Sequence, residues 1–139
     1  MKYKKSPCPC YCINLRRAAG CVSSIYDSHL AEVDLTVNQY SLLRNIQQMV
    51  SCTAGELAEQ VGLERTTIVR MLKPLTEREL IGDTEAESRS RRFQLTEAGE
   101  ALLERSLPLW RSAQTEIEDR IGKEELKTLI SIFDRLEVS

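Results

Sequence analysis

The sequence predicts a mainly α-helical fold with a small β-hairpin, in the arrangement of a winged helix-turn-helix. Apolar residues recur at steps of three and four through most of the chain, which is the spacing of amphipathic helices. This pattern breaks once, between Leu80 and Thr96, where the segment RFQL alternates with period two. A short predicted helix and a basic one lie directly before the break, as a helix-turn-helix requires. At 139 residues the chain has the length of about one domain.

Two capping boxes mark the predicted helices of the N-terminal half. The first helix spans residues 13–30 and carries its apolar residues on one face. The second begins at the capping box Thr36-x-x-Gln39 and runs to about Met49. Thr53-x-x-Glu56 begins a short third helix in the same way.

The third predicted helix ends at Gly62, because glycine readily takes the left-handed conformation of a helix end. A fourth helix extends from near Arg65 to near Leu80. Two antiparallel strands and a charged hairpin tip follow.

The C-terminal part is predicted to form two more helices. Thr96 caps a long helix that extends to about Arg120, and Pro108 should interrupt and kink it because proline lacks the amide hydrogen. Gly122 separates this helix from a last amphipathic one over residues 123–138.

Composition and charge bear on where the protein acts and on the partners that it binds. The chain has no apolar run of membrane-spanning length and no signal-peptide core, so we expect a cytoplasmic protein without membrane partners. The net charge is −2, but basic residues gather in two places. Residues 1–26 contain no acid, and residues 89–92 read RSRR. Local basic patches matter more than net charge when phosphates are the target.

Residues 58–75 have the pattern of a DNA-reading helix pair. Ala58-x3-Gly62-x5-Ile68 supplies a small residue at the helix crossing, a glycine at the turn and an apolar anchor. We expect the apolar residues of the second helix to be mostly turned inward, namely Ile68, Val69, Leu72 and Leu75. Solvation of an ordinary helix would explain any single cation here, but the combination with RSRR at a hairpin tip favours DNA. The candidate DNA contacts on this helix are Arg65, Thr66, Thr67, Arg70 and Lys73.

Three stretches of the chain resemble the MarR (multiple antibiotic resistance regulator) family of bacterial transcription factors: LTVNQYSLLRNI, TAGELAEQVGLERTTIVRMLKPLTERELI and ESRSRRFQLTEAGEALL. The resemblance begins near residue 12 and covers nearly all that follows. It implies that Glu87 and Arg89 match the acidic residue and the minor-groove arginine of the family's wing, and the candidate DNA-binding residues of the wing are Glu87, Arg89 and Arg91. It also implies a homodimer that reads a pseudo-palindromic operator in double-stranded DNA.

The chain departs from the family pattern at three positions. Glu87 replaces the usual Asp, and Glu79 stands where Gly often ends the recognition helix. Pro74 lies within that helix and leaves the Arg70 carbonyl without its usual partner, so a bend is expected in the second half. We therefore expect DNA contacts from the first half of the helix ahead of a contact from Lys73.

The expected homodimer determines how we divide the chain into segments. Three amphipathic elements, 13–30, 96–120 and 123–138, carry more apolar surface than a winged helix-turn-helix can cover, and a second chain would cover it. We divide the chain into a cysteine-containing arm (1–12), a dimerisation helix (13–34), a DNA-binding region (35–96) and C-terminal dimerisation helices (97–139).

The cysteines allow three interpretations. In the cytoplasm thiols stay reduced, so a structural disulfide framework is not expected. Cys12 lies near a helix start beside Arg16, where a reactive thiolate is favoured, and the resemblance implies that some relatives sense oxidants through an N-terminal cysteine. Metal ligation is the second interpretation and no chemical role the third, and we assign no metal or cofactor because no Cys-x2-Cys pair is present. The redox candidates are Cys8, Cys10, Cys12 and Cys21, whereas core packing is the commoner role for Cys21 and is expected for Cys52.

The predicted function is that of a sequence-specific DNA-binding transcriptional regulator, a repressor released by an oxidant or a small molecule. The resemblance implies small aromatic ligands for some relatives, and the candidate effector-pocket residues are Tyr26, His29 and Trp110. The alternative is a cysteine-based redox or metal-binding protein that does not bind DNA. An enzyme is not expected, because the chain has one His, no assignable Ser-His-Asp set and no Gly-rich phosphate loop.

Overall fold

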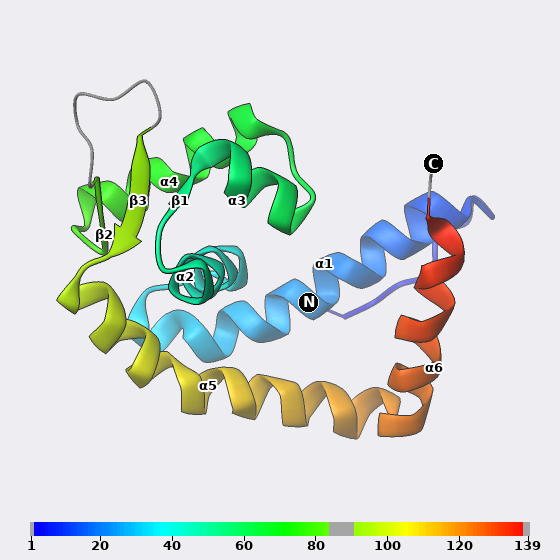
Figure 1. Cartoon of the computed structure of the whole chain (residues 1–139). Coiled ribbons are helices and arrows are strands. Elements are labelled where there is room, and N and C mark those ends of the chain that lie inside the picture. The colour runs from blue at the N-terminus through cyan, green and yellow to red at the C-terminus, as the bar shows by residue number, and fades with distance from the viewer. Residues whose placement is uncertain (1, 84–90, 138–139) are drawn as a thin grey trace. The chain divides into compact units, whose positions relative to one another are not determined.

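A computed structural model of the chain describes residues 2–83 and 91–137 (Figure 1). The chain divides into two compact units, Met1–His29 with Pro108–Ser139 (unit 1) and Leu30–Leu107 (unit 2), whereas the sequence length suggested one domain. No helix in the described part of the chain is long and apolar enough to cross a bilayer.

Unit 2 begins with a short 3-10 helix, Ala31–Val33, and three α-helices follow: α2 (Val37–Met49), α3 (Ala54–Val61) and α4 (Arg65–Glu77). Both predicted capping boxes are confirmed. The Thr36 hydroxyl accepts a hydrogen bond from the backbone N–H of Gln39 at 3.1 Å, and Thr53 accepts one from Glu56 at 3.1 Å. Each cap satisfies an amide that would otherwise have no partner at the helix start.

The helices α3 and α4 end in the same way, at a residue with positive φ. Gly62 ends α3 with φ 72°, as predicted, and the N–H of Leu63 donates to the carbonyl of Ala58. Glu79 takes the same left-handed conformation after α4, with φ 58°, and the N–H of Leu80 donates to the carbonyl of Leu75. The α4 helix therefore ends at Glu77, three residues before the predicted boundary, although it continues through Pro74.

The wing is a three-stranded antiparallel sheet in the order β1-β3-β2. The two predicted antiparallel strands are present as β2 (Ile81–Asp83) and β3 (Arg92–Leu95), in which Ile81 pairs with Leu95. The charged tip predicted between them lies outside the described residues. The sequence did not predict β1 (Cys52–Thr53), which pairs with the other edge of β3 through Cys52 and Phe93. The β1 strand joins the wing to the start of α3 (Figure 1).

The core of unit 2 lies where its helices and sheet meet. The α2 helix packs against α3 and β3, and α3 packs against α4. Side chains from each helix are fully buried there, including Leu43, Ile46, Leu57, Ile68 and Leu75. Burial of a side chain of this size stabilises the fold by about 1.5–3 kcal/mol, so this core holds α4 in a fixed orientation.

Unit 1 contains α1 (Tyr11–Leu30, to His29), the C-terminal part of α5 (Glu97–Ile121), α6 (Lys123–Phe133) and the 3-10 helix Asp134–Leu136. The α1 helix starts two residues before the predicted Ile13. The α5 helix is continuous through Pro108, so the predicted interruption is wrong. Gly122, with φ 107°, separates α5 from α6 as predicted.

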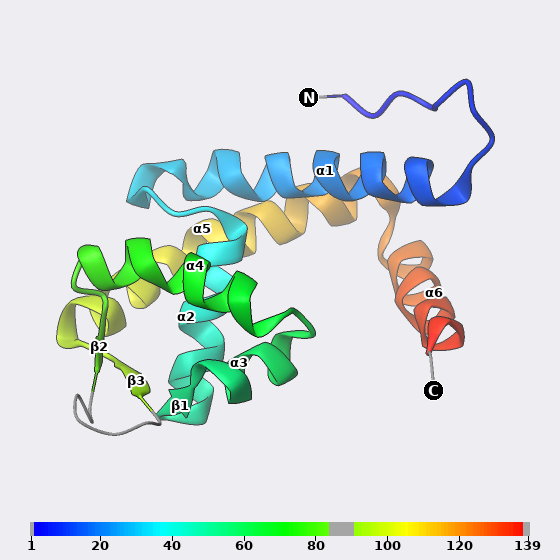
Figure 2. The same cartoon turned by 90° about the horizontal axis from the view of Figure 1, so that it is seen from above.

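Hydrogen bonds join α1 to α5 inside unit 1, where the two helices lie side by side in Figures 1 and 2. The Tyr26 hydroxyl donates to Oε1 of Gln114. The imidazole Nε2 of His29 lies 2.9 Å from Oε1 of Glu116, whose other oxygen accepts from Arg120 at 2.9 Å. These two partners hold the pKa of the Glu116 carboxyl below its usual value.

Candidate nucleic-acid interface

The exposed face of α4 carries the cations that the sequence predicted. Arg65, Thr66, Arg70 and Lys73 are exposed, and Thr67 is half-buried. Ile68, Leu72 and Leu75 are buried, as expected.

Val69 was expected to face inward, and this prediction is wrong, because 53% of its surface is exposed. It follows Arg65 by four residues and precedes Lys73 by four, and this spacing places all three residues on one helix face.

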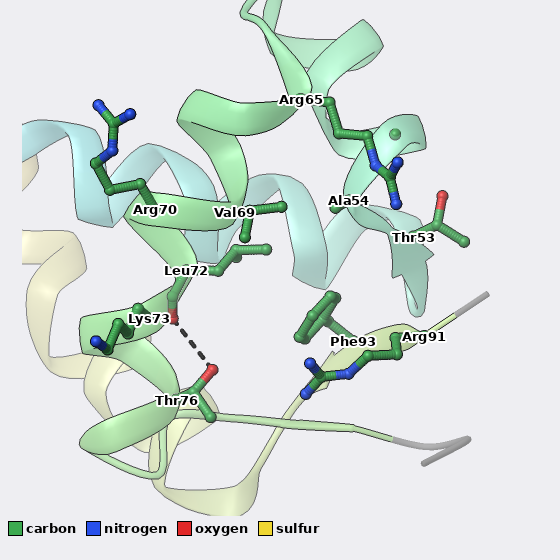
Figure 3. A pocket seen from close by; sticks show the side chains of 11 residues that line it. Thr53, Ala54, Arg65, Val69, Arg70, Leu72, Lys73, Thr76, Arg91 and Phe93 are labelled. Atoms are coloured by element: carbon green, nitrogen blue, oxygen red, sulfur yellow. Dashed lines mark hydrogen bonds between the residues drawn. The ribbon is translucent and has the colours of Figure 1, made fainter. Parts of the chain in front are cut away.

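A groove of about 800 Å³ lies between this face of α4, the start of α3 and the strand β3 (Figure 3). Ala54 and Leu72 form parts of its buried wall, beside Phe93. Figure 3 shows Arg65 and Arg91 reaching into it from opposite sides, with Val69 pointing inward and Arg70 pointing away from Phe93. The described residues that line it include four cations and no carboxylate: Thr53, Ala54, Gly55, Arg65, Val69, Arg70, Leu72, Lys73, Thr76, Arg91 and Phe93.

Arg91 is fixed by two neighbours at the base of the wing. Its Nε donates to Oδ2 of Asp83 at 2.5 Å, which joins the end of β2 to the start of β3. Its guanidinium carbon lies 5.5 Å from the centre of the Phe93 ring, within cation–π range. Asp83 and Phe93 are also paired across the ladder, so the two side chains that contact Arg91 lie at one register position.

Arg92, the next residue, ties β3 to the start of α3. Its Nη1 donates to Oε1 of Glu56 at 3.0 Å, and its Nη2 donates to the carbonyl of Ser51 at 3.2 Å. Glu56 is also the third residue of the α3 capping box and accepts from the N–H of Thr53 at 3.2 Å. The hydrogen bonds from Thr53 and then the charge of Arg92 hold the pKa of the Glu56 carboxyl below its usual value.

Val50 precedes Ser51 in a rare backbone conformation. Its φ and ψ are 67° and −57°, and the N–H of Ser51 donates to the carbonyl of Met49 at 2.7 Å. This is a γ-turn with positive φ, which is strained for any residue with a Cβ and more so for a β-branched one. The turn directs the chain from α2 into β1, where Ser51 meets Arg92.

The N-terminal cysteines lie in an arm organised by Asn14 of α1. The Asn14 Oδ1 atom accepts from the Tyr3 hydroxyl at 2.9 Å and from the N–H of Ser6 at 3.0 Å. Its Nδ2 donates to the carbonyls of Cys8, at 3.4 Å, and Cys10, at 3.0 Å. The arm therefore turns back along the first turns of α1 (Figure 2).

The cysteines differ in exposure. Cys8, Cys10 and Cys12 are exposed, and an Nη2 atom of Arg16 lies 3.9 Å from the Cys12 sulfur. Cys21 is half-buried. Cys52 is fully buried, which confirms its predicted packing role, and burial raises the pKa of its thiol. Within the described ranges, no three His, Cys, Asp or Glu side chains are grouped as metal ligands would be.

An apolar groove of about 960 Å³ lies in unit 1, lined by residues of α1, α5 and α6 that include Leu15, Val22, Leu126, Ile130 and Phe133. Among the candidate effector residues, Tyr26 lines it. Burial, and then the charge of Glu118, raise the pKa of the Tyr26 hydroxyl. Trp110 is half-buried, and neither Trp110 nor His29 is among the described residues of this lining.

Comparison with known proteins identifies the family. The sequence pattern of the MarR family matches residues 35–85. The chain is 31% identical to the transcriptional regulator MosR of M. tuberculosis, with a TM-score of 0.77, and the match covers 92% of this chain and 95% of MosR. The chain belongs to the MarR family.

Two similar structures contain DNA. MosR in complex with DNA is 32% identical to this MarR-family chain, with a TM-score of 0.74, and the match covers 93% of this chain and 99% of MosR. The transcriptional repressor CouR, bound to a 23-mer DNA duplex, is 27% identical, with a TM-score of 0.81 and coverage of 91% and 92%.

The groove gathers part of the set predicted from sequence. Arg65, Arg70, Lys73 and Arg91 all line it, whereas Thr66 and Thr67 are not in its described lining. Glu87 and Arg89 lie outside the described residues. Sequence reasoning missed Val69, although its spacing from Arg65 and Lys73 was a usable signal. It also missed Phe93, whose position beneath Arg91 depends on pairing in the sheet.

Proposed function

We propose that this chain is a sequence-specific double-stranded DNA-binding transcriptional repressor that acts as a homodimer. One observation carries the proposal: the described lining of the groove beside α4 holds four cations and no carboxylate, although the chain as a whole has a net charge of −2. A polyanion is the partner that such a local concentration of positive charge favours. We place the protein in the cytoplasm with its DNA partner, and we assign it no catalytic activity.

The exposed side chains of α4 supply the chemistry for reading a major groove. Arginine presents two donors to guanine, and hydroxyl groups pair with either base or phosphate. We assign base or phosphate contacts to Arg65, Thr66, Thr67, Arg70 and Lys73. The caps of α3 and the buried anchors of α4 support this role, because a recognition helix must be held rigidly to discriminate between bases.

We assign the wing residues to the flanking DNA. Arg91 is held by Asp83 and Phe93, so its guanidinium is oriented before DNA arrives. For Glu87 and Arg89 the proposal rests on the family resemblance alone, which gives the arginine a minor-groove contact.

A second copy of the chain covers the apolar surface of unit 1. The α6 helix has no buried residue in the single chain, and Leu129, Ile130, Ile132 and Phe133 are exposed. Leu15 of α1 is also exposed and lines the same apolar groove. Contiguous apolar surface of this kind marks an interface, and a homodimer pairs two recognition helices with a pseudo-palindromic operator.

Two signals are proposed for release from DNA. The exposed cysteines of the arm suit an oxidant, because a thiol that reacts with peroxide must be accessible. The groove that Tyr26 lines suits a small aromatic ligand, because it combines apolar walls with a phenolic hydroxyl. The DNA-binding assignment has more support than a redox or metal-binding protein without DNA, because such a protein gives no reason for four cations to gather in one groove.

Gel shifts on the DNA upstream of the chain's own coding region test the proposal. Arg65→Ala should weaken specific binding by about 1–3 kcal/mol if the guanidinium contacts a base, or reduce the salt slope by about 1 if it contacts a phosphate. Arg105→Ala is the matched control, since Arg105 is exposed on α5 and lies outside the groove lining. Equal losses from both variants would contradict the site, and wild-type binding that is indifferent to sequence would contradict the function.

A further inference from the structure

Val69 is a large apolar side chain exposed at the centre of a polar surface. It is 53% exposed and lies one helical turn from both Arg65 and Lys73. In Figure 3 it points into the groove, between Arg65 and Leu72. Its β-branched side chain strongly prefers one rotamer in a helix, so its two methyl groups have a nearly fixed direction. Stability does not explain the residue, because alanine is a better helix former at an exposed position.

DNA bound in this groove would present one kind of apolar group to the Val69 side chain. Among base edges in the major groove, the C5-methyl group of thymine is the apolar feature, whereas the others are hydrogen-bond donors and acceptors. Arg65, Thr66 and Arg70 can each donate to an acceptor, but Val69 cannot. If Val69 faced a hydrogen-bond donor or acceptor of a base edge, that base atom would lose its hydrogen-bond partner.

We propose that Val69 is a specificity-determining residue that contacts the C5-methyl group of one thymine in each operator half-site. This inference rests on the proposed DNA-binding function and names the base feature that α4 reads without a hydrogen bond. The neighbouring cations hold the helix against the phosphates, and the valine methyl groups then exclude water from the thymine methyl. Burying one such group changes affinity by about fourfold, and two half-sites would multiply the effect.

Removal of single thymine methyl groups tests the contact. The wild-type chain first selects its operator from a pool of random duplexes, and each thymine of the selected sequence is then replaced by deoxyuridine. We expect one symmetry-related pair of positions at which this replacement weakens wild-type binding, by about fourfold per half-site. Replacement at the other thymines should leave the affinity unchanged.

Val69→Ala tests whether Val69 reads that methyl group. The variant should fold, because Val69 is exposed and alanine favours the helix. It should bind the thymine operator more weakly than wild type and show no further loss on the deoxyuridine operator. Leu63→Ala is the control, since Leu63 is an exposed apolar residue (46%) just before α4 that does not line the groove. This control should keep the full sensitivity to deoxyuridine.

Each result separates the inference from the function on which it rests. Selection of an operator that is insensitive to every deoxyuridine replacement would overturn the Val69 contact and leave the DNA-binding function intact. Equal deoxyuridine sensitivity in wild type and Val69→Ala would do the same. A loss above about a hundredfold in Val69→Ala would also overturn it, because two methyl contacts do not supply that much affinity. Failure to enrich any sequence would overturn the proposed function together with the inference.

Discussion

Arg92 and Glu56 form an ion pair of 3.0 Å that connects the wing to the start of α3. Glu56 also completes the α3 capping box, so a single carboxylate accepts from the strand β3 and from the backbone of Thr53. The groove wall formed by Ala54 and Gly55 begins directly after that cap. The ion pair therefore couples the geometry of the wing to the geometry of the groove.

The first prediction concerns pH. The pKa of Glu56 is lowered in the folded chain, first by Thr53 and then by Arg92, so the charged form contributes stability above its unfolded pKa. That contribution is lost as the pH falls through the lower folded value. Glu56→Gln retains a capping residue but has no charge, so it should be less stable than wild type at pH 7 and should lose less stability on acidification.

Urea unfolding of both proteins at pH 7 and at pH values below about 4.3, the unperturbed value for Glu, measures this effect. Glu104→Gln is a suitable control, because Glu104 is exposed on α5. An identical pH dependence for wild type and Glu56→Gln would show that the charge of Glu56 contributes nothing to folding.

The second prediction concerns the turn at Val50. Its side chain is 75% exposed, so substitution removes little packing and mainly changes backbone strain. Val50→Ala keeps the Cβ atom at φ 67°, whereas Val50→Gly removes it. We expect Val50→Gly to be more stable than Val50→Ala by about 1 kcal/mol, since a γ-turn with positive φ is a sparsely populated conformation that costs a residue with a Cβ roughly 1–3 kcal/mol. Chemical denaturation of the pair gives the difference, and a more stable alanine variant would contradict the strain.

The third prediction compares two glycines. A Cβ on Gly99 would lie 2.1 Å from the Leu80 carbonyl oxygen, so the start of α5 or the chain before β2 would have to move. A Cβ on Gly55 would meet nothing closer than Thr53 Oγ1 at 3.9 Å. Gly99→Ala should therefore destabilise the chain by about 1–3 kcal/mol, whereas Gly55→Ala should be neutral or stabilising by up to about 1 kcal/mol. Thermal unfolding of the two variants measures both changes in stability. A Gly99→Ala variant that is as stable as wild type or more stable would contradict the close packing at Gly99.

Local signals in the sequence were sufficient for most helices of this fold. Thr36, Thr53 and Gly62 act within three or four residues of themselves, so their roles can be recognised without knowing the tertiary structure. The strand β1 was missed because it has only two residues and forms through pairing with β3, some 40 positions later. Such pairing leaves no periodicity in a two-residue segment.

The candidate site was predicted less completely for the same reason. The cations of α4 are visible as residue types, but Val69 was assigned to the core because its apolar character outweighed its position on the helix. Its phase relative to Ile68, Leu72 and Leu75 is what places it outside. The roles of Arg92 and Phe93 depend on partners in other elements, Ser51 and Asp83, which sequence spacing does not connect.

The last prediction concerns the cysteine arm. Cys12 lies in the first turn of α1 with Arg16 beside its sulfur, and Cys8 and Cys10 are exposed in the preceding arm. Hydrogen peroxide should oxidise the Cys12 thiolate to a sulfenic acid, with reduction of the peroxide to water. A thiolate of Cys8, Cys10 or Cys21 should then attack that sulfur and displace hydroxide, which leaves as water and forms a disulfide within one chain or across the dimer.

The disulfide should lower operator affinity. The arm leads directly into α1, which we propose to form part of the dimer, and a new covalent link there changes how two recognition helices match half-sites about 34 Å apart. Intact mass and gel shifts of reduced and peroxide-treated protein measure both steps, and dithiothreitol should restore binding. Cys12→Ser should keep its affinity after peroxide. Cys52 serves as an internal control, because burial raises the pKa of its thiol and it should stay unmodified in the folded chain. Equal affinity of the reduced and disulfide-bonded wild type would remove the arm from the regulatory mechanism and leave the groove that Tyr26 lines as the site for a signal.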